Sequence, residues 1–132
     1  MLAHRVILSL LFDTGVLMRT KRFVADYRYT QAYSCANDAD QVVLIDISRE
    51  RWSGFPKLIE SYNRRLEVPM TVGGHVDSVD YALRLMNAGA FGVVVGWKYR
   101  SIYEAIAWRT GSQSLTAGLH YGKAAPVDRW AE

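Results

Sequence analysis

Cysteine is almost absent from this sequence, since Cys35 is the only one among 132 residues. An intrachain disulfide is therefore excluded, and a reducing compartment is favoured. Long hydrophobic runs are absent as well: the first apolar run ends at Asp13, far short of the roughly 18 residues of a membrane span. No small-residue cleavage site follows that run. We expect a soluble, cytoplasmic protein.

Charge and histidine patterns exclude two further classes. The net charge is only +3, and no stripe of Lys and Arg is interleaved with aromatics, so nucleic-acid binding is not predicted. The three histidines, His4, His75 and His120, are far apart and lack metal-ligand spacing. We expect no metal and no cofactor.

What the sequence does contain is a series of apolar runs that are rich in Val, Ile and Leu and do not alternate with polar residues. Strands of a parallel sheet that is covered on both faces have this pattern. The predicted strands are Val6–Phe12, Val42–Ile47, Val68–Val72 and Gly92–Val95, with a shorter fifth stretch at Ser114–Leu119.

Segments with helical periodicity separate these runs. Apolar residues recur at helical spacing from Phe55 to Leu66 and from Val79 to Met86, with Asp77 or Ser78 as the cap of the second helix. A capping-box pattern from Ser101 to Glu104 predicts a third helix, which Gly111 ends. Thr30–Ala39 offers only about two turns. Such alternation predicts an α/β fold with a parallel sheet and right-handed crossovers.

Several stretches resemble the cyclase subunit of imidazole glycerol phosphate synthase, the HisF family. They are Met1–Ile7, Val43–Ile47, Val68–Ser78, Arg84–Ala90 and Gly111–Ser114. The family forms (β/α)₈ barrels, whereas this chain carries four units and a fraction. The resemblance implies a (βα)₄ half of a TIM barrel with helices on one face. Residues 1–120 are interpreted as the half-barrel domain and 121–132 as an irregular tail.

The family closes an imidazole ring with ammonia from a glutaminase partner, using two aspartates at the ends of its first and fifth strands. In this sequence Leu11 occupies the first of these positions and His120 falls near the second. Leu cannot transfer a proton. Asp13 is two residues further on, in a turn predicted at Asp13–Gly15, after which residues 16–19 are predicted as a second short strand. Leu10–Phe12, Arg19–Thr20 and Gly111–Ser114 resemble a HisF-like branch from lipopolysaccharide amidino-sugar gene clusters.

The resemblance also implies a phosphate site after the third and fourth strands. Its candidate residues here are Gly73, Gly74, His75, Gly96, Trp97 and Lys98. Glycines and helix N-termini present backbone N–H groups to anions, but two glycines also suit a tight turn without a ligand. Asp46 either faces the barrel mouth, as a weak catalytic candidate together with His120, or is a helix-capping or turn carboxylate.

A half-barrel leaves apolar side chains and open strand edges uncovered, which predicts self-association into a dimer or a higher even-numbered assembly. Three functions remain open. The chain is a non-catalytic HisF-like protein that binds a phosphorylated ligand or channels ammonia for a partner, an active lyase of histidine or lipopolysaccharide sugar synthesis, or a structural relic. Arg5 resembles a residue of the family's ammonia gate, but Gln41 stands in place of its acidic partner, which favours the alternative role of a solvated arginine.

Overall fold

The strands of the chain form one sheet. The computed structural model describes residues 4–21, 24–28 and 36–119, with only the backbone given for residues 19–21 and 24–28. Within these ranges the sheet has seven strands in the order β3-β2-β1-β4-β5-β6-β7. The strands are β1 (Ile7–Asp13), β2 (Val16–Lys21), β3 (Val24–Arg28), β4 (Gln41–Asp46), β5 (Met70–Gly73), β6 (Gly92–Gly96) and β7 (Leu115–Gly118).

Five strands, β1 and β4 to β7, are parallel neighbours, as the apolar runs predicted. The other two form an antiparallel hairpin beside the carboxyl end of β1. Thr14 and Gly15 both have positive φ, which is the conformation of a tight hairpin turn. The sequence indicated β2 but not β3, because residues 24–28 carry no apolar run. The helix expected at Thr30–Ala39 lies largely outside the described residues.

The α-helices are α2 (Phe55–Arg65), α3 (Val79–Asn87) and α4 (Tyr103–Thr110), with 3₁₀ turns η1 (Trp97–Ile102) and η2 (Ser112–Ser114) on either side of α4. Ser78 caps α3 by accepting a bond of 3.2 Å from the N–H of Tyr81, as predicted. The capping box at Ser101 was wrong, because Ser101 lies inside η1 and no side chain caps α4. None of the described helices is long and apolar enough to cross a membrane.

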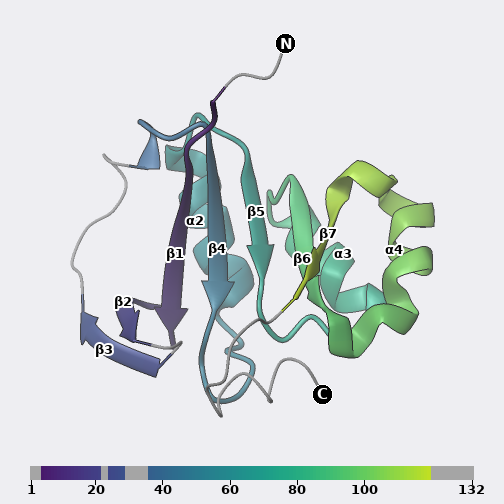
Figure 1. Cartoon of the computed structure of the whole chain (residues 1–132), viewed down its shortest axis with the longest axis horizontal. Coiled ribbons are helices and arrows are strands. Elements are labelled where there is room, and N and C mark those ends of the chain that lie inside the picture. Colours follow the sequence, from purple (N-terminus) through teal and green to yellow (C-terminus); the bar gives the residue numbers. More distant parts are fainter. Residues whose placement is uncertain (1–3, 22–23, 29–35, 120–132) are drawn as a thin grey trace.

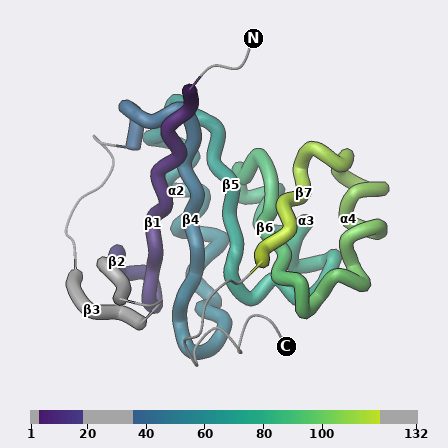
Figure 2. Tube along the Cα trace, viewed as in Figure 1, coloured from purple at the N-terminus to yellow at the C-terminus, as the bar shows by residue number. Residues whose placement is uncertain are grey.

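Helices α2 and α3 lie behind the parallel strands in Figure 1, and the trace in Figure 2 shows the same layering. Burial alternates along β4, so that every second side chain points into this helix-covered face. The strand register places the buried side chains of neighbouring strands side by side: Leu10, Phe12, Val42, Leu44, Met70, Val72, Val93 and Val95.

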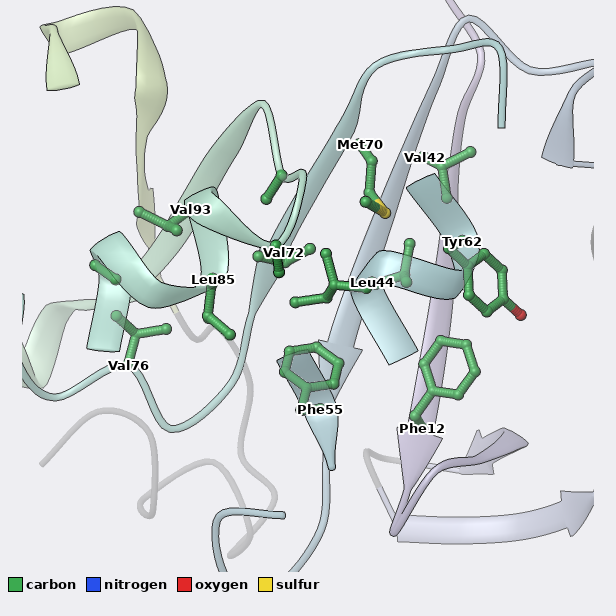
Figure 3. Packing of buried hydrophobic residues seen from close by; sticks show 14 of the residues in the cluster. Phe12, Val42, Leu44, Phe55, Tyr62, Met70, Val72, Val76, Leu85 and Val93 are labelled. Atoms are coloured by element: carbon green, nitrogen blue, oxygen red, sulfur yellow. The ribbon is translucent and has the colours of Figure 1, made fainter. Parts of the chain in front are cut away.

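The core lies between this face and the helices. Figure 3 shows Leu44 and Phe55 packed together, with the Phe12 and Tyr62 rings beside them. The Phe12 and Tyr62 ring centroids are 5.5 Å apart at 76°, which is the edge-to-face arrangement that aromatic quadrupoles favour. Leu44, Phe55 and Ile59 are fully buried, so α2 is held mainly by apolar packing.

The opposite face of the sheet, here called the open face, has no helix on it among the described residues. Its positions on the parallel strands are Ile7, Ser9, Leu11, Asp13, Gln41, Val43, Ile45, Thr71, Gly73, Gly92, Val94, Gly96, Thr116 and Gly118. Ile7 is 53% exposed, and Leu11, Val43, Ile45 and Val94 are half-buried. The structure thus confirms an α/β fold with a mostly parallel sheet and helices on one face.

Candidate functional site

The carboxyl ends of the parallel strands lie along one edge of the sheet, at the lower side of Figure 1. We call this the mouth edge. The loops that leave it are the β1–β2 turn, the β4–α2 loop (residues 47–54), the β5–α3 loop (residues 74–78) and the start of η1. In parallel α/β sheets, ligands bind outside the carboxyl ends of the strands. Asp46 and all the phosphate-site candidates from the sequence are at this edge, and His120 lies outside the described residues.

Asp46 ends β4 at the mouth edge, and its side chain is fully buried. It pairs in register with Phe12, which places it on the helix-covered face. One carboxylate oxygen accepts bonds from the N–H (3.0 Å) and Oγ (2.5 Å) of Ser48, and the other accepts one from the N–H of Trp52 at 3.2 Å. Ser48 Oγ also accepts a 2.7 Å bond from the N–H of Thr14. Of the two roles open for Asp46, this geometry is that of a turn carboxylate.

The glycine pair after β5 has a packing explanation. Gly74 has a φ of +99°, and a side chain there would run into the backbone of Asp46. A Cβ on Gly73 would lie 2.8 Å from the Cβ of Val94. Both positions therefore require glycine, so that the end of β5 and the start of the following loop can pass close to β6 and β4, whether or not a ligand binds.

His75 follows in the same loop, and its φ of +58° lies in the left-handed region that non-glycine residues rarely adopt. Its ring Nε2 is 2.7 Å from the carbonyl oxygen of Ser48. Because a carbonyl oxygen only accepts, Nε2 has to carry the proton of this bond. The imidazole is thus turned toward the β4–α2 loop.

Arg51 joins the same two loops. Its guanidinium donates to the carbonyl oxygen of His75 at 3.0 Å and forms an ion pair with Asp77. The guanidinium carbon also lies 3.8 Å from the ring centroid of Tyr81, within the range of a cation–π contact. The Tyr81 hydroxyl is buried and has no hydrogen-bond partner among the described residues. Burial raises the pKa of Tyr81, and the Arg51 charge opposes this shift.

The second group of candidates follows β6, the strand that neighbours β5. Gly96 ends β6, and Trp97 and Lys98 begin η1. Trp97 is 47% exposed, and Lys98 is exposed. The Arg100 guanidinium donates to the Trp97 carbonyl at 3.0 Å and lies 5.0 Å from the Trp97 ring centroid. The mouth edge thus has Arg51 beside the loop after β5, and Lys98 and Arg100 in the turn after β6.

The position that the resemblance assigns to a catalytic aspartate lies on the open face. Leu11 pairs with Ile45 in the middle of the sheet and is half-buried. Asp13, which the sequence placed in a turn, is the last residue of β1, half-buried and on the same face.

The amino-terminal end of the open face carries a row of polar contacts. Arg5 donates to Gln41 Oε1 at 3.4 Å, and Gln41 Nε2 donates to Thr71 Oγ1 at 2.8 Å. These contacts link the segment before β1 to β4 and β5, and they join Arg5 to the neutral amide of Gln41, which stands where the family has an acidic partner.

The sequence missed Ser48 and Arg51. Both belong to the polar stretch Ser48–Arg51, and no spacing distinguishes Arg51 from the nearby Arg49. Their roles depend on which loop lies opposite, and only the fold supplies that information.

Five parallel strands under one layer of helices, with polar loops gathered at their carboxyl ends, define the class as a partial (β/α)₈ barrel. No protein-family model matches the chain. It is 31% identical over 131 residues to the imidazole glycerol phosphate synthase subunit HisF of Dictyoglomus turgidum, covering 90% of this chain and 51% of the relative.

A putative HisF subunit of Leptospira interrogans is 25% identical over 133 residues, covering 93% of this chain and 52% of the relative. A GMP reductase of Streptococcus agalactiae is 27% identical over 94 residues, covering 71% and 29%. The chain is a HisF-like half-barrel, and it spans about half the length of the HisF relatives it matches.

Proposed function

We propose that this HisF-like half-barrel binds a phosphorylated ligand at the mouth edge and does not itself catalyse ring closure. The observation that carries the proposal is Leu11. It stands on the open face of β1, where the resemblance requires an aspartate, and a hydrocarbon side chain can neither accept nor donate a proton.

Support for the ligand comes from the ends of β5 and β6. These strands are adjacent, with Gly73 paired to Val94, so the loops after them start side by side. Lys98 is exposed at the second loop, and Arg100 is held over Trp97 by a bond to its carbonyl oxygen. Cations beside backbone N–H groups at a strand end provide charge-assisted bonds for a phosphate dianion.

A thermal-shift titration with ribose 5-phosphate tests the site. At 100 times the dissociation constant, binding should stabilise the fold by roughly 2.7 kcal/mol. Ribose without the phosphate is the ligand control. Lys98→Met should weaken binding, whereas Lys57→Met, which removes the same charge from the exposed side of α2, should not. Absence of any shift would favour the structural relic.

Asp13 supports a second candidate function, an active lyase of the imidazole glycerol phosphate synthase kind. It supplies a half-buried carboxylate on the open face, two residues beyond Leu11. An assay with free ammonia removes the need for a glutaminase partner. Ring closure by the unaltered chain and its loss in Asp13→Asn would establish this activity in place of the first proposal.

The open face itself supports self-association, and its proposed occupant is a second copy of this chain. Within the described residues, β7 is an edge strand, and Ile7–Leu10 of β1 pair only with β4. Each copy thus has two open edges, and β7 of one copy could pair with the free part of β1 in a second copy. Apolar side chains around Val43 and Ile45 would then be covered from both sides, and size measurements at defined concentrations test this arrangement.

A further inference from the structure

The β5–α3 loop has a conformation that its own sequence does not favour. Gly74 and His75 both have positive φ, at +99° and +58°. Glycine adopts this region freely, but a residue with a Cβ does so only when contacts from elsewhere hold it there. The contacts that hold His75 therefore determine the shape of this loop.

Those contacts come from the β4–α2 loop. The Ser48 carbonyl accepts the bond from the His75 ring, and the Arg51 guanidinium donates to the His75 carbonyl at 3.0 Å. Ser48 is in turn fixed by the buried carboxylate of Asp46. The ring and the backbone of His75 are thus each bonded to the neighbouring loop.

The Arg51 guanidinium makes three contacts. It holds the His75 carbonyl, pairs with Asp77 and stacks on the Tyr81 ring at 3.8 Å. Both bonds come from the same terminal nitrogen, Nη2, and the planar group also lies over the Tyr81 ring. The geometry suits a brace between loops better than a free cation.

We propose that Arg51 is a positioning residue of the phosphate site: it fixes the backbone from Gly73 to Asp77 in its anion-binding conformation. This inference rests on the function proposed above. According to it, Arg51 affects phosphate binding by holding the β5–α3 loop in shape, and Asp77 helps because its ion pair holds Arg51 in place.

A competing explanation is that Arg51 attracts the phosphate directly through its charge. The two explanations predict opposite changes in phosphate affinity when the charge of Asp77 is removed. Removing the Asp77 charge would free Arg51 and remove repulsion, so direct attraction predicts tighter phosphate binding in Asp77→Asn. A positioning role predicts weaker binding, because a neutral amide replaces the Arg51–Asp77 ion pair with a weaker hydrogen bond even though the site becomes more positive.

The experiment measures ribose 5-phosphate binding to the whole chain by calorimetry. Arg51→Met should weaken binding about tenfold, the lower end of the loss caused by removing an outer-shell partner of a metal ligand. Arg49→Met is the matched control, since it removes the same charge from an exposed position of the same loop. Arg51→Lys should stay weakened, because a compact ammonium cannot stack flat on the Tyr81 ring while it bonds to the His75 carbonyl.

Each result decides the matter. Equal affinities for Arg51→Met and Arg49→Met, tighter binding by Asp77→Asn, or full binding by Arg51→Lys would each overturn the positioning role while leaving the phosphate site standing. No binding by the unaltered chain would remove the phosphate site and the inference together. The melting temperature of each variant is measured in parallel, and if Arg51→Met fails to fold, Asp77→Asn and Arg51→Lys carry the test.

Discussion

The two faces of the sheet are made from the same apolar strands but end in different surroundings. On the helix-covered face, Leu44, Val72 and Val93 are fully buried. On the open face, Val43 and Ile45 are half-buried, and Ile7 is more than half exposed. Continuous apolar strands suit a sheet that is covered twice. This contrast indicates that the apolar side chains of the open face suit a second covering layer, which the described residues do not supply.

The largest expected effect is a loss of folding stability, which should be greater for a substitution on the helix-covered face than for one on the open face. Leu44→Ala should lower the free energy of unfolding by about 2 to 5 kcal/mol, because a fully buried side chain leaves a cavity. Leu11→Ala should cost about 1 kcal/mol in dilute solution and more at high concentration, where a second copy covers it. Urea unfolding at two protein concentrations measures both. A concentration-independent loss at Leu11 would contradict a covered open face.

A charge on the open face should break association directly. Val43→Lys is expected to weaken self-association by about 100-fold, since a cation would be desolvated in an apolar contact. Trp108→Lys is the control because Trp108 is 90% exposed on α4, away from this face. Equilibrium sedimentation measures both variants, and an equal effect of the two would show that the open face is not the contact.

Asp46→Asn tests the loop network behind the mouth edge. The amide keeps the shape but loses charge-assisted bonds to Ser48 and Trp52, so the fold should lose about 1 to 3 kcal/mol. Asp38→Asn, at an exposed position, should change stability by less than about 0.5 kcal/mol. Denaturant titration of the pair provides the comparison, and similar losses would refute a buried turn carboxylate.

The smallest effect concerns two tyrosines. Tyr103 donates to the Val95 carbonyl at 2.8 Å, so Tyr103→Phe should cost about 1 kcal/mol. Tyr81→Phe removes a buried hydroxyl without a partner among the described residues and should be neutral or stabilising near neutral pH. Thermal unfolding distinguishes them, and a loss at Tyr81 as large as at Tyr103 would show an unrecognised partner.

Tyr81 should also make the stability of the fold depend on pH. Burial raises the folded-state pKa of Tyr81 above 10.0, so the unfolded chain releases its proton first as pH rises. Stability should therefore fall as pH passes about 10, and Tyr81→Phe should reduce that fall. Urea midpoints from pH 8 to 11 measure the difference, and identical profiles for both chains would contradict the raised pKa.

Much of the fold could be predicted from the sequence because strand burial and helix amphipathicity leave direct patterns. The runs at Val42–Ile47 and Gly92–Val95 are strands, and Ser78 caps its helix. The capping box at Ser101 failed because residues 97–102 form a 3₁₀ turn. The site was predicted only as neighbouring loops: Arg51 and Arg49 look alike in sequence, and only the facing β5–α3 loop distinguishes them. His120 and the tail from residue 121 lie outside the described residues.

The molar mass in solution tests most directly whether a second copy covers the open face. Size-exclusion chromatography with light scattering at micromolar concentration should give an even multiple of the 132-residue chain, with twice its mass as the smallest assembly. A stable species with the mass of one chain under those conditions would contradict the account.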